Sequence, residues 1–297
     1  MSRTIFGLSA ALATPFHADG SIDTAKAARH AAWCLANGCA SVTLFGTTGE
    51  GASVSAAERN TVLDAFQAAG IEAGKIVACV MANASGDARD QTAEILRRGG
   101  RSVLLAPPSY FKNPTEDGVF AWFSEVLSAL GDEARGIILY NIPSVTAVEL
   151  SVALVGRLRE AFPRAIAGVK DSSGNWTYTQ ALLAAHKDIA ILIGDERSLA
   201  AGIRMGAEGA ISGMANIMPQ RLSALIASGE DDADLVSLVE AVVSQPVIPA
   251  VKALISARTG ESEWLRVRPP LVAISDAAAG SLTSALARLQ PASAAAA

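Results

Sequence analysis

Cysteine and histidine are scarce in this 297-residue chain, which contains three of each. The cysteines have no Cys-x-x-Cys spacing and no histidines clustered beside them, so we expect neither a metal site nor a disulfide framework. Free thiols fit a reducing cytoplasm. The residues concerned are Cys34, Cys39, Cys79, His17, His30 and His186.

Charge is also sparse, and no stretch is strongly basic. Lys and Arg number 24 against 29 Asp and Glu, a net charge of -5, so we expect no nucleic-acid partner. No apolar run reaches the ~18 residues that span a bilayer, so we expect no membrane partner and a soluble, cytoplasmic protein. The apolar run from Ile5 to Ala13 superficially resembles a secretory signal, and we interpret it as a first β-strand closed by Thr14-Pro15.

What the chain has in abundance is short apolar runs separated by amphipathic stretches. Hydrophobic residues make up 51% of the sequence, enough for a large core. Eight runs are candidate strands, and many of them have the nearly continuous apolar character of buried parallel strands. Eight alternating βα units predict a (β/α)8 TIM barrel over residues 1–228. The predicted strands are 6–13, 41–45, 76–81, 102–106, 136–141, 165–170, 190–193 and 210–212.

Helix signals lie between these strands. Asp23, Ser55 with Glu58, and Thr115 are predicted helix N-caps, and glycines at 38, 70, 99 and 131 follow predicted helices. Residues 229–297 form a predicted C-terminal helical region with helices at 232–244, 248–259 and about 270–289, and we expect 292–297 to be frayed. No GxGxxG or GxxxxGK[ST] motif occurs, so the usual signatures of nucleotide binding are missing.

Lys170 is the sharpest candidate for chemistry. It is one of six lysines and closes the apolar run 165–169, whereas the other five occupy positions that a helix surface or a loop would tolerate. A lysine desolvated at the mouth of a barrel favours the neutral amine, which can form a Schiff base with a carbonyl compound. The alternative is a structural lysine paired with Asp171, Asp195 or Glu196.

Two other strand ends carry polar groups. The Gly46-Thr47-Thr48-Gly49-Glu50 loop suits a carboxylate or phosphate, because glycines let consecutive backbone N–H groups converge. Taken by itself, the loop favours the alternative, an ordinary βα turn in which Thr or Ser caps the next helix. Tyr140 ends the strand next to that of Lys170. It is either a proton relay or a core tyrosine whose hydroxyl is hydrogen-bonded.

The order of these motifs resembles the dihydrodipicolinate synthase and N-acetylneuraminate lyase family of pyruvate-dependent class I aldolases. The resemblance extends from the first strand to the C-terminal helices and implies a barrel with three C-terminal helices, commonly a tetramer built as a dimer of dimers. The motifs are Gly-Thr-Thr-Gly-Glu at 46–50, Pro-Pro-Ser-Tyr at 107–110, Tyr-Asn-Ile-Pro-Ser at 140–144, Gly-Val-Lys-Asp at 168–171 and Gly-Asp-Glu at 194–196.

The resemblance assigns roles to individual residues. Lys170 matches the Schiff-base lysine and Tyr140 the proton-shuttling tyrosine. Thr47 and Thr48 match the pair whose amides hold the pyruvate carboxylate, and the Thr47 hydroxyl joins the relay. Tyr110 matches a second relay tyrosine that reaches the neighbouring subunit's site, with Phe111 as the alternative for that position.

Other positions are expected to govern specificity. Ile211 resembles a residue whose backbone lines the site. Dihydrodipicolinate synthases usually carry Tyr-Asn-x-Pro-Ser-Arg, whose arginine binds the carboxylate of aspartate semialdehyde, and here Val145 and then Thr146 follow the serine. An apolar residue cannot replace the bidentate guanidinium. We assign specificity to Val145, Thr146 and the motif Gly194-Asp195-Glu196.

The sequence therefore predicts a Schiff-base lyase that joins pyruvate to an aldehyde or cleaves their adduct, without a metal or organic cofactor. The substrate expected from the resemblance is a 2-keto-3-deoxy sugar acid or a related compound. Three alternatives stay open: a dihydrodipicolinate synthase acting on aspartate semialdehyde, a Schiff-base dehydratase of a keto-deoxy sugar acid, and a non-catalytic 2-oxo-acid binding protein.

Overall fold

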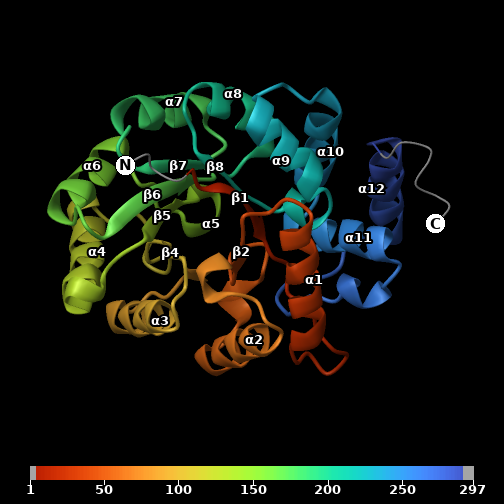
Figure 1. Cartoon of the computed structure of the whole chain (residues 1–297), viewed down its shortest axis with the longest axis horizontal. Helices are drawn as coiled ribbons and strands as arrows, with labels where there is room; N and C mark the ends of the chain where they lie inside the picture. The colour runs from red at the N-terminus through yellow and green to blue at the C-terminus, as the bar shows by residue number, and fades with distance from the viewer. Residues whose placement is uncertain (1–4, 290–297) are drawn as a thin grey trace.

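A computed structural model describes residues 5–289 of the chain, and its centre is a closed barrel of eight parallel strands (Figure 1). The strands pair in chain order, and the first also pairs with the eighth. All eight predicted strands are confirmed to within two residues at each end, including the N-terminal run. They are β1 (Gly7–Ala11), β2 (Ser41–Leu44), β3 (Ile76–Val80), β4 (Ser102–Leu105), β5 (Ile137–Asn141), β6 (Ile166–Asp171), β7 (Ala190–Ile193) and β8 (Gly209–Ser212).

Helices surround this barrel (Figure 1). The predicted caps are confirmed, since the Asp23 and Thr115 side chains accept from backbone amides three residues on and Ser55 forms a capping box with Glu58. The four predicted glycines each follow a helix with positive φ. The helices are α1 (Thr24–Ala36), α2 (Ala56–Ala68), α3 (Ser85–Arg97), α4 (Glu116–Leu130), α5 (Pro143–Thr146), α6 (Val152–Ala161), α7 (Trp176–Ala185), α8 (Leu199–Arg204) and α9 (Pro219–Ser228).

Three helices follow the barrel: α10 (Ala233–Val243), α11 (Val247–Thr259) and α12 (Asp276–Leu289). The predicted start of the last helix near residue 270 is wrong. Pro269 and Pro270 lie in a turn in which the Leu271 amide donates to the Arg268 carbonyl, and helical geometry begins only at Asp276. The proposed boundary at 228 coincides with the end of α9. The predicted fraying of residues 292–297 concerns residues outside the described part.

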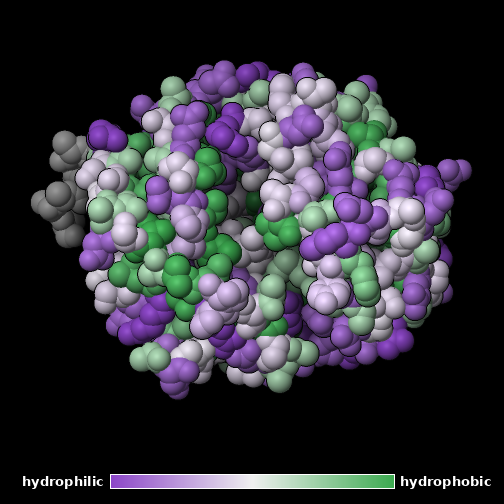
Figure 2. Space-filling model, turned by 180° about the vertical axis from the view of Figure 1, so that it is seen from behind, coloured by the Kyte–Doolittle hydropathy of each residue, from purple (hydrophilic) through white to green (hydrophobic). Residues whose placement is uncertain are grey.

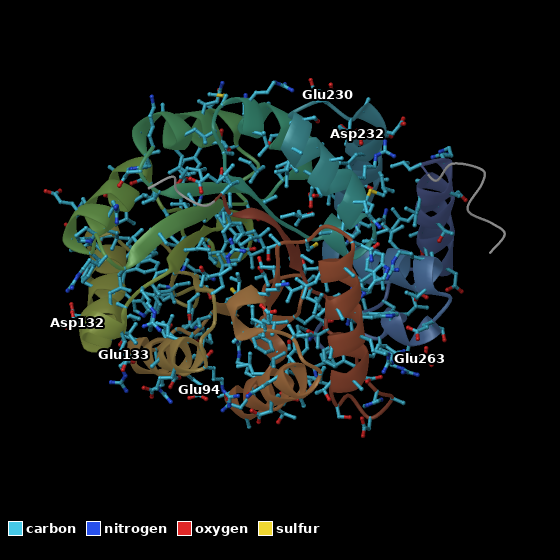
Figure 3. The ribbon with its side chains drawn as sticks, viewed as in Figure 1. Glu94, Asp132, Glu133, Glu230, Asp232 and Glu263 are labelled. Atoms are coloured by element: carbon cyan, nitrogen blue, oxygen red, sulfur yellow. The ribbon has the colours of Figure 1, made fainter. Side chains whose placement is uncertain are left out.

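Apolar side chains are buried inside the barrel and beneath the helices, whereas most charged side chains lie at the surface. One cluster of buried residues fills the barrel interior and includes Cys79, Leu104 and Tyr140, while a larger one packs between strands and helices. Acidic side chains such as Asp132 and Glu230 lie at the periphery (Figure 3). The opposite face to that in Figure 1 is hollowed near its middle (Figure 2). Within residues 5–289, no helix is both long and apolar enough to cross a membrane.

Candidate active site

Lys170 and Tyr140 lie side by side at the carboxyl ends of β6 and β5. The two residues are register partners in the parallel ladder, which brings both side chains into the barrel mouth. The Lys170 Nζ donates to the Tyr140 Oη at 3.2 Å and lies 4.3 Å from the centroid of its ring. Both are buried, with exposed fractions of 6% and 2%. A lysine amine is thus held in a largely desolvated place beside a phenol.

The carboxylates that were candidates to pair with Lys170 are engaged elsewhere. Asp171 accepts from Asn141 and Thr179, Asp195 forms an ion pair with Arg197, and Glu196 accepts from Ser212. Among the described residues, none of the ion pairs within 4.0 Å involves Lys170. The geometry therefore favours the reactive interpretation of this lysine over a structural ion pair.

The loop after β2 reaches the same phenol. The Thr47 Oγ1 lies 3.2 Å from the Tyr140 Oη, so the tyrosine hydroxyl connects Lys170 to this loop. The turn is tight, because a Cβ on Gly49 would lie 2.7 Å from the Leu12 carbonyl oxygen. Within residues 5–289, the backbone N–H groups of Thr47 and Thr48 make no hydrogen bond, so they are available to an anion.

Glu50 and Lys252 form a buried ion pair behind this loop, which the sequence reasoning missed. Both side chains are 0% exposed, and the Lys252 Nζ binds the Glu50 Oε1 and also donates to the Arg266 carbonyl at 2.5 Å. The other Glu50 oxygen accepts from the Arg268 amide at 2.8 Å. The expectation that every lysine except Lys170 occupies a surface or loop position is therefore wrong for Lys252. The available signal was its place in the apolar stretch 250–255.

These groups open into a cavity of about 350 Å³ at the barrel mouth. Tyr110 and Thr146 do not line it. Tyr110 is 74% exposed and its backbone amide donates to the Asn83 side chain, whereas the Thr146 hydroxyl donates to the carbonyl of Ile142, the residue before α5. Ser144, Ser172, Ser173 and Arg197 do line it and were not predicted. The predicted residues on its wall are Thr47, Thr48, Tyr140, Val145, Lys170, Gly194, Asp195, Glu196 and Ile211.

Two acidic residues after β7 shape the electrostatics of this cavity. Burial raises the pKa of Glu196, whose carboxylate accepts from the Ser212 hydroxyl at 2.5 Å. Asp195 binds Arg197 through two nitrogens, at 2.9 Å and 2.7 Å, and this contact raises the pKa of Arg197. The guanidinium charge is therefore neutralised locally, and the acidic oxygens are acceptors suited to hydroxyl groups.

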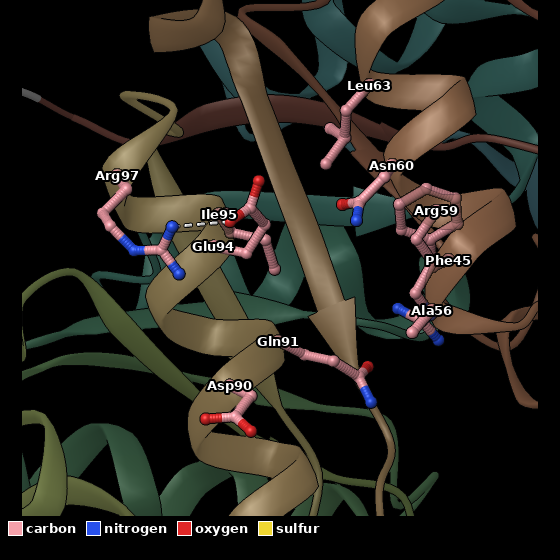
Figure 4. Close-up of a pocket in the computed structure, with 10 residues that line it drawn as sticks. All are labelled: Phe45, Ala56, Arg59, Asn60, Leu63, Asp90, Gln91, Glu94, Ile95 and Arg97. Atoms are coloured by element: carbon pink, nitrogen blue, oxygen red, sulfur yellow. Dashed lines mark hydrogen bonds and ion pairs between the residues drawn. The ribbon is translucent and has the colours of Figure 1, made fainter.

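A second cavity, of about 260 Å³, lies between α2 and α3 (Figure 4). Arg59, Asn60 and Gln91 line it, and Arg97 on its wall pairs with Glu94 at 2.7 Å. None of the residues that line it is a predicted site residue. In the described part of the chain, no group of three or more His, Cys, Asp or Glu side chains is arranged to hold a metal ion.

Comparisons with known proteins all indicate the same family. Residues 4–289 match the model of the dihydrodipicolinate synthetase family. An uncharacterized DapA-like lyase of Chloroflexus aurantiacus is 30% identical over 293 residues, 95% of this chain and 96% of that protein. A 4-hydroxy-tetrahydrodipicolinate synthase of Hyphomonas neptunium is 32% identical over 74% of each chain. A crystal structure described as dihydrodipicolinate synthase from Agrobacterium tumefaciens strain C58 is 56% identical, with a TM-score of 0.95 over 96% of this chain and 100% of the other.

Proposed function

We propose a reaction for this chain on the premise that it belongs to the dihydrodipicolinate synthetase family and is therefore a pyruvate-dependent lyase. In the proposed reaction Lys170 is the amine that forms the Schiff base. The observation that carries this assignment is the buried Lys170 amine 3.2 Å from the Tyr140 hydroxyl, with no carboxylate partner among residues 5–289. An uncharged amine in such a place is a nucleophile toward a keto group.

The proposed steps follow from the contacts around Lys170. Its neutral amine adds to the keto carbon of pyruvate, the carbonyl oxygen leaves as water, and a protonated imine remains. Loss of a methyl proton gives an enamine, whose carbon attacks the aldehyde, and hydrolysis releases the product and the free amine. Tyr140 moves protons at these steps, with Thr47 completing the relay at 3.2 Å. The free amides of Thr47 and Thr48 hold the pyruvate carboxylate.

The residues around the rest of the cavity support a hydroxylated aldehyde, or its 2-keto-3-deoxy acid adduct, as the second substrate. Val145 supplies no charge where a carboxylate of aspartate semialdehyde would need one. Glu196, bound to Ser212, and Asp195 offer acceptors for hydroxyl groups.

A synthase acting on aspartate semialdehyde is the second candidate. Two of the relatives described above carry the synthase name, and Arg197 places a guanidinium on the cavity wall. Against this stands the two-nitrogen contact of Arg197 with Asp195, which would have to break before the guanidinium could bind a substrate carboxylate. The loss of a bidentate arginine at position 145 should cost about 2–5 kcal/mol, or roughly 30- to several-thousand-fold in selectivity.

Borohydride trapping tests the proposal. With pyruvate and borohydride, Lys170 should be converted to a stable secondary amine that intact mass and peptide mapping detect. Lys170→Arg should abolish the adduct, because a guanidinium stays protonated, whereas Lys75→Arg, a change at an exposed lysine, should retain it. Labelling at another residue, or none, would overturn the assignment.

Product assays with the untreated, unmodified protein then discriminate between the candidate substrates. We expect pyruvate release from 2-keto-3-deoxy acids and poor condensation with aspartate semialdehyde. A synthase kcat/KM of ~10⁴ M⁻¹s⁻¹ or above would favour the second candidate instead. A dehydratase would consume the keto-deoxy acid without releasing pyruvate, and a binding protein would turn over none of these compounds.

A further inference from the structure

Five valines from α10 and α11 line the same cavity as Lys170. They are Val239, Val242, Val243, Val247 and Val251, and we call them the valine wall. Three of them are buried, whereas Val243 and Val247, on either side of the turn between the two helices, are each 43% exposed. The wall therefore extends from the interior of the cavity to its mouth.

The position of the valine wall follows from its neighbours. A Cβ placed on Gly213 would lie 3.4 Å from the Thr48 Oγ1 and 3.8 Å from the Val251 Cγ2, so the inner end of the wall lies close to the proposed carboxylate loop. Helix α10 packs against the turn η4 (Glu196–Ser198), which carries Glu196 and Arg197. The polar groups after β7 and the valine wall are thus adjacent surfaces of one cavity.

These two surfaces make different demands on a bound molecule. The Glu196–Ser212 pair and Asp195 can hydrogen-bond hydroxyls, but valine side chains offer neither donor nor acceptor. A hydroxyl pressed against the wall would lose water without gaining a partner, which is unfavourable, whereas a methyl group there gains from leaving water. A fully hydroxylated sugar chain would therefore match only part of the cavity.

We infer that the aldehyde substrate carries a hydroxyl near its reacting carbon and ends in a methyl or longer alkyl group that contacts the valine wall. This inference rests on the proposed aldolase function and narrows its substrate class. The hydroxyl is bound by the acidic residues after β7, and the alkyl end lies against Val243 and Val247 at the cavity mouth.

A matched pair of aldehydes tests the inference. 2-Hydroxypropanal and 2,3-dihydroxypropanal differ only in a terminal methyl against a hydroxymethyl group. With pyruvate as donor, we expect kcat/KM to be about tenfold or more higher for 2-hydroxypropanal, within the range that a hydrophobic pocket gives for such a difference. The double variant Val243→Thr/Val247→Thr places hydroxyls of nearly the same shape on the wall and should reduce the preference to about threefold or less.

Val272→Thr is the control, because Val272 is 75% exposed and lies outside this cavity. It should leave the preference unchanged. Far-ultraviolet circular dichroism, light scattering and borohydride trapping with pyruvate establish that each variant is folded, assembled and able to form the Schiff base. Failure of the unmodified protein to form the pyruvate adduct would refute the proposed function itself.

Three results would overturn the inference while leaving Schiff-base chemistry intact. The first is an equal or higher kcat/KM for 2,3-dihydroxypropanal. The second is formation of the pyruvate adduct with no condensation of either aldehyde. The third is an unchanged preference in a double variant that is folded and assembled, which would show that Val243 and Val247 do not contact the alkyl end.

Discussion

Lys252→Met should destabilise the protein strongly by leaving Glu50 buried without its cation. The lysine and the carboxylate are both fully buried, and after the substitution the Arg268 amide would be the one remaining donor to the Glu50 carboxylate among residues 5–289. Burial lowers the pKa of Lys252, and the attraction of Glu50 acts against this shift. Each charge therefore offsets part of the cost of burying the other. Breaking such a pair typically costs about 3–5 kcal/mol, a large part of the ~5–15 kcal/mol of a folded domain.

Urea unfolding at pH 7, followed by circular dichroism, measures this loss. The double variant Glu50→Gln/Lys252→Met removes both charges and should recover about 1 kcal/mol or more relative to Lys252→Met, because no uncompensated ion remains. Where Lys252→Met still folds, we expect a higher KM for pyruvate, since Glu50 follows the Thr47-Thr48 loop. A destabilisation below about 1 kcal/mol, or a double variant less stable than the single one, would refute the reasoning.

Two further predictions concern assembly and pH. We propose that Tyr110 acts at the site of a neighbouring subunit, so the protein should be at least a dimer by light scattering at assay concentration, and an active monomer would contradict this role. Burial lowers the pKa of His30 from 6.5 to about 4, so unfolding takes up a proton below pH 6.5. Stability should therefore fall by about 3 kcal/mol between pH 6.5 and pH 4, and His30→Gln should flatten this part of the urea-midpoint profile; a parallel profile would exclude His30.

The sequence by itself determined the barrel and predicted the residues at the centre of the candidate site. Strand runs and helix caps are local features, because burial on both faces makes a parallel strand apolar and a cap bonds an amide only three residues away. Lys170 and Tyr140 were found for a related reason. Each ends a strand, neighbouring strands in a parallel barrel end at the same edge, and register then places the two residues together.

Only the tertiary structure decided which distant residues complete the site. Glu50 and Lys252 are 202 positions apart, so the apolar stretch around Lys252 could indicate that the lysine is buried but not which carboxylate neutralises it. The same holds for the valine wall, where apolar spacing predicts a buried helix face but not whether that face packs against the core or borders a cavity. Val145 lines the cavity, whereas the side chain of the next residue, Thr146, is buried away from it. The reason is that adjacent side chains of the short helix α5 point in different directions. Hydrophobic spacing predicts which side chains are buried. Which residues they contact is decided only when the helices pack on the barrel.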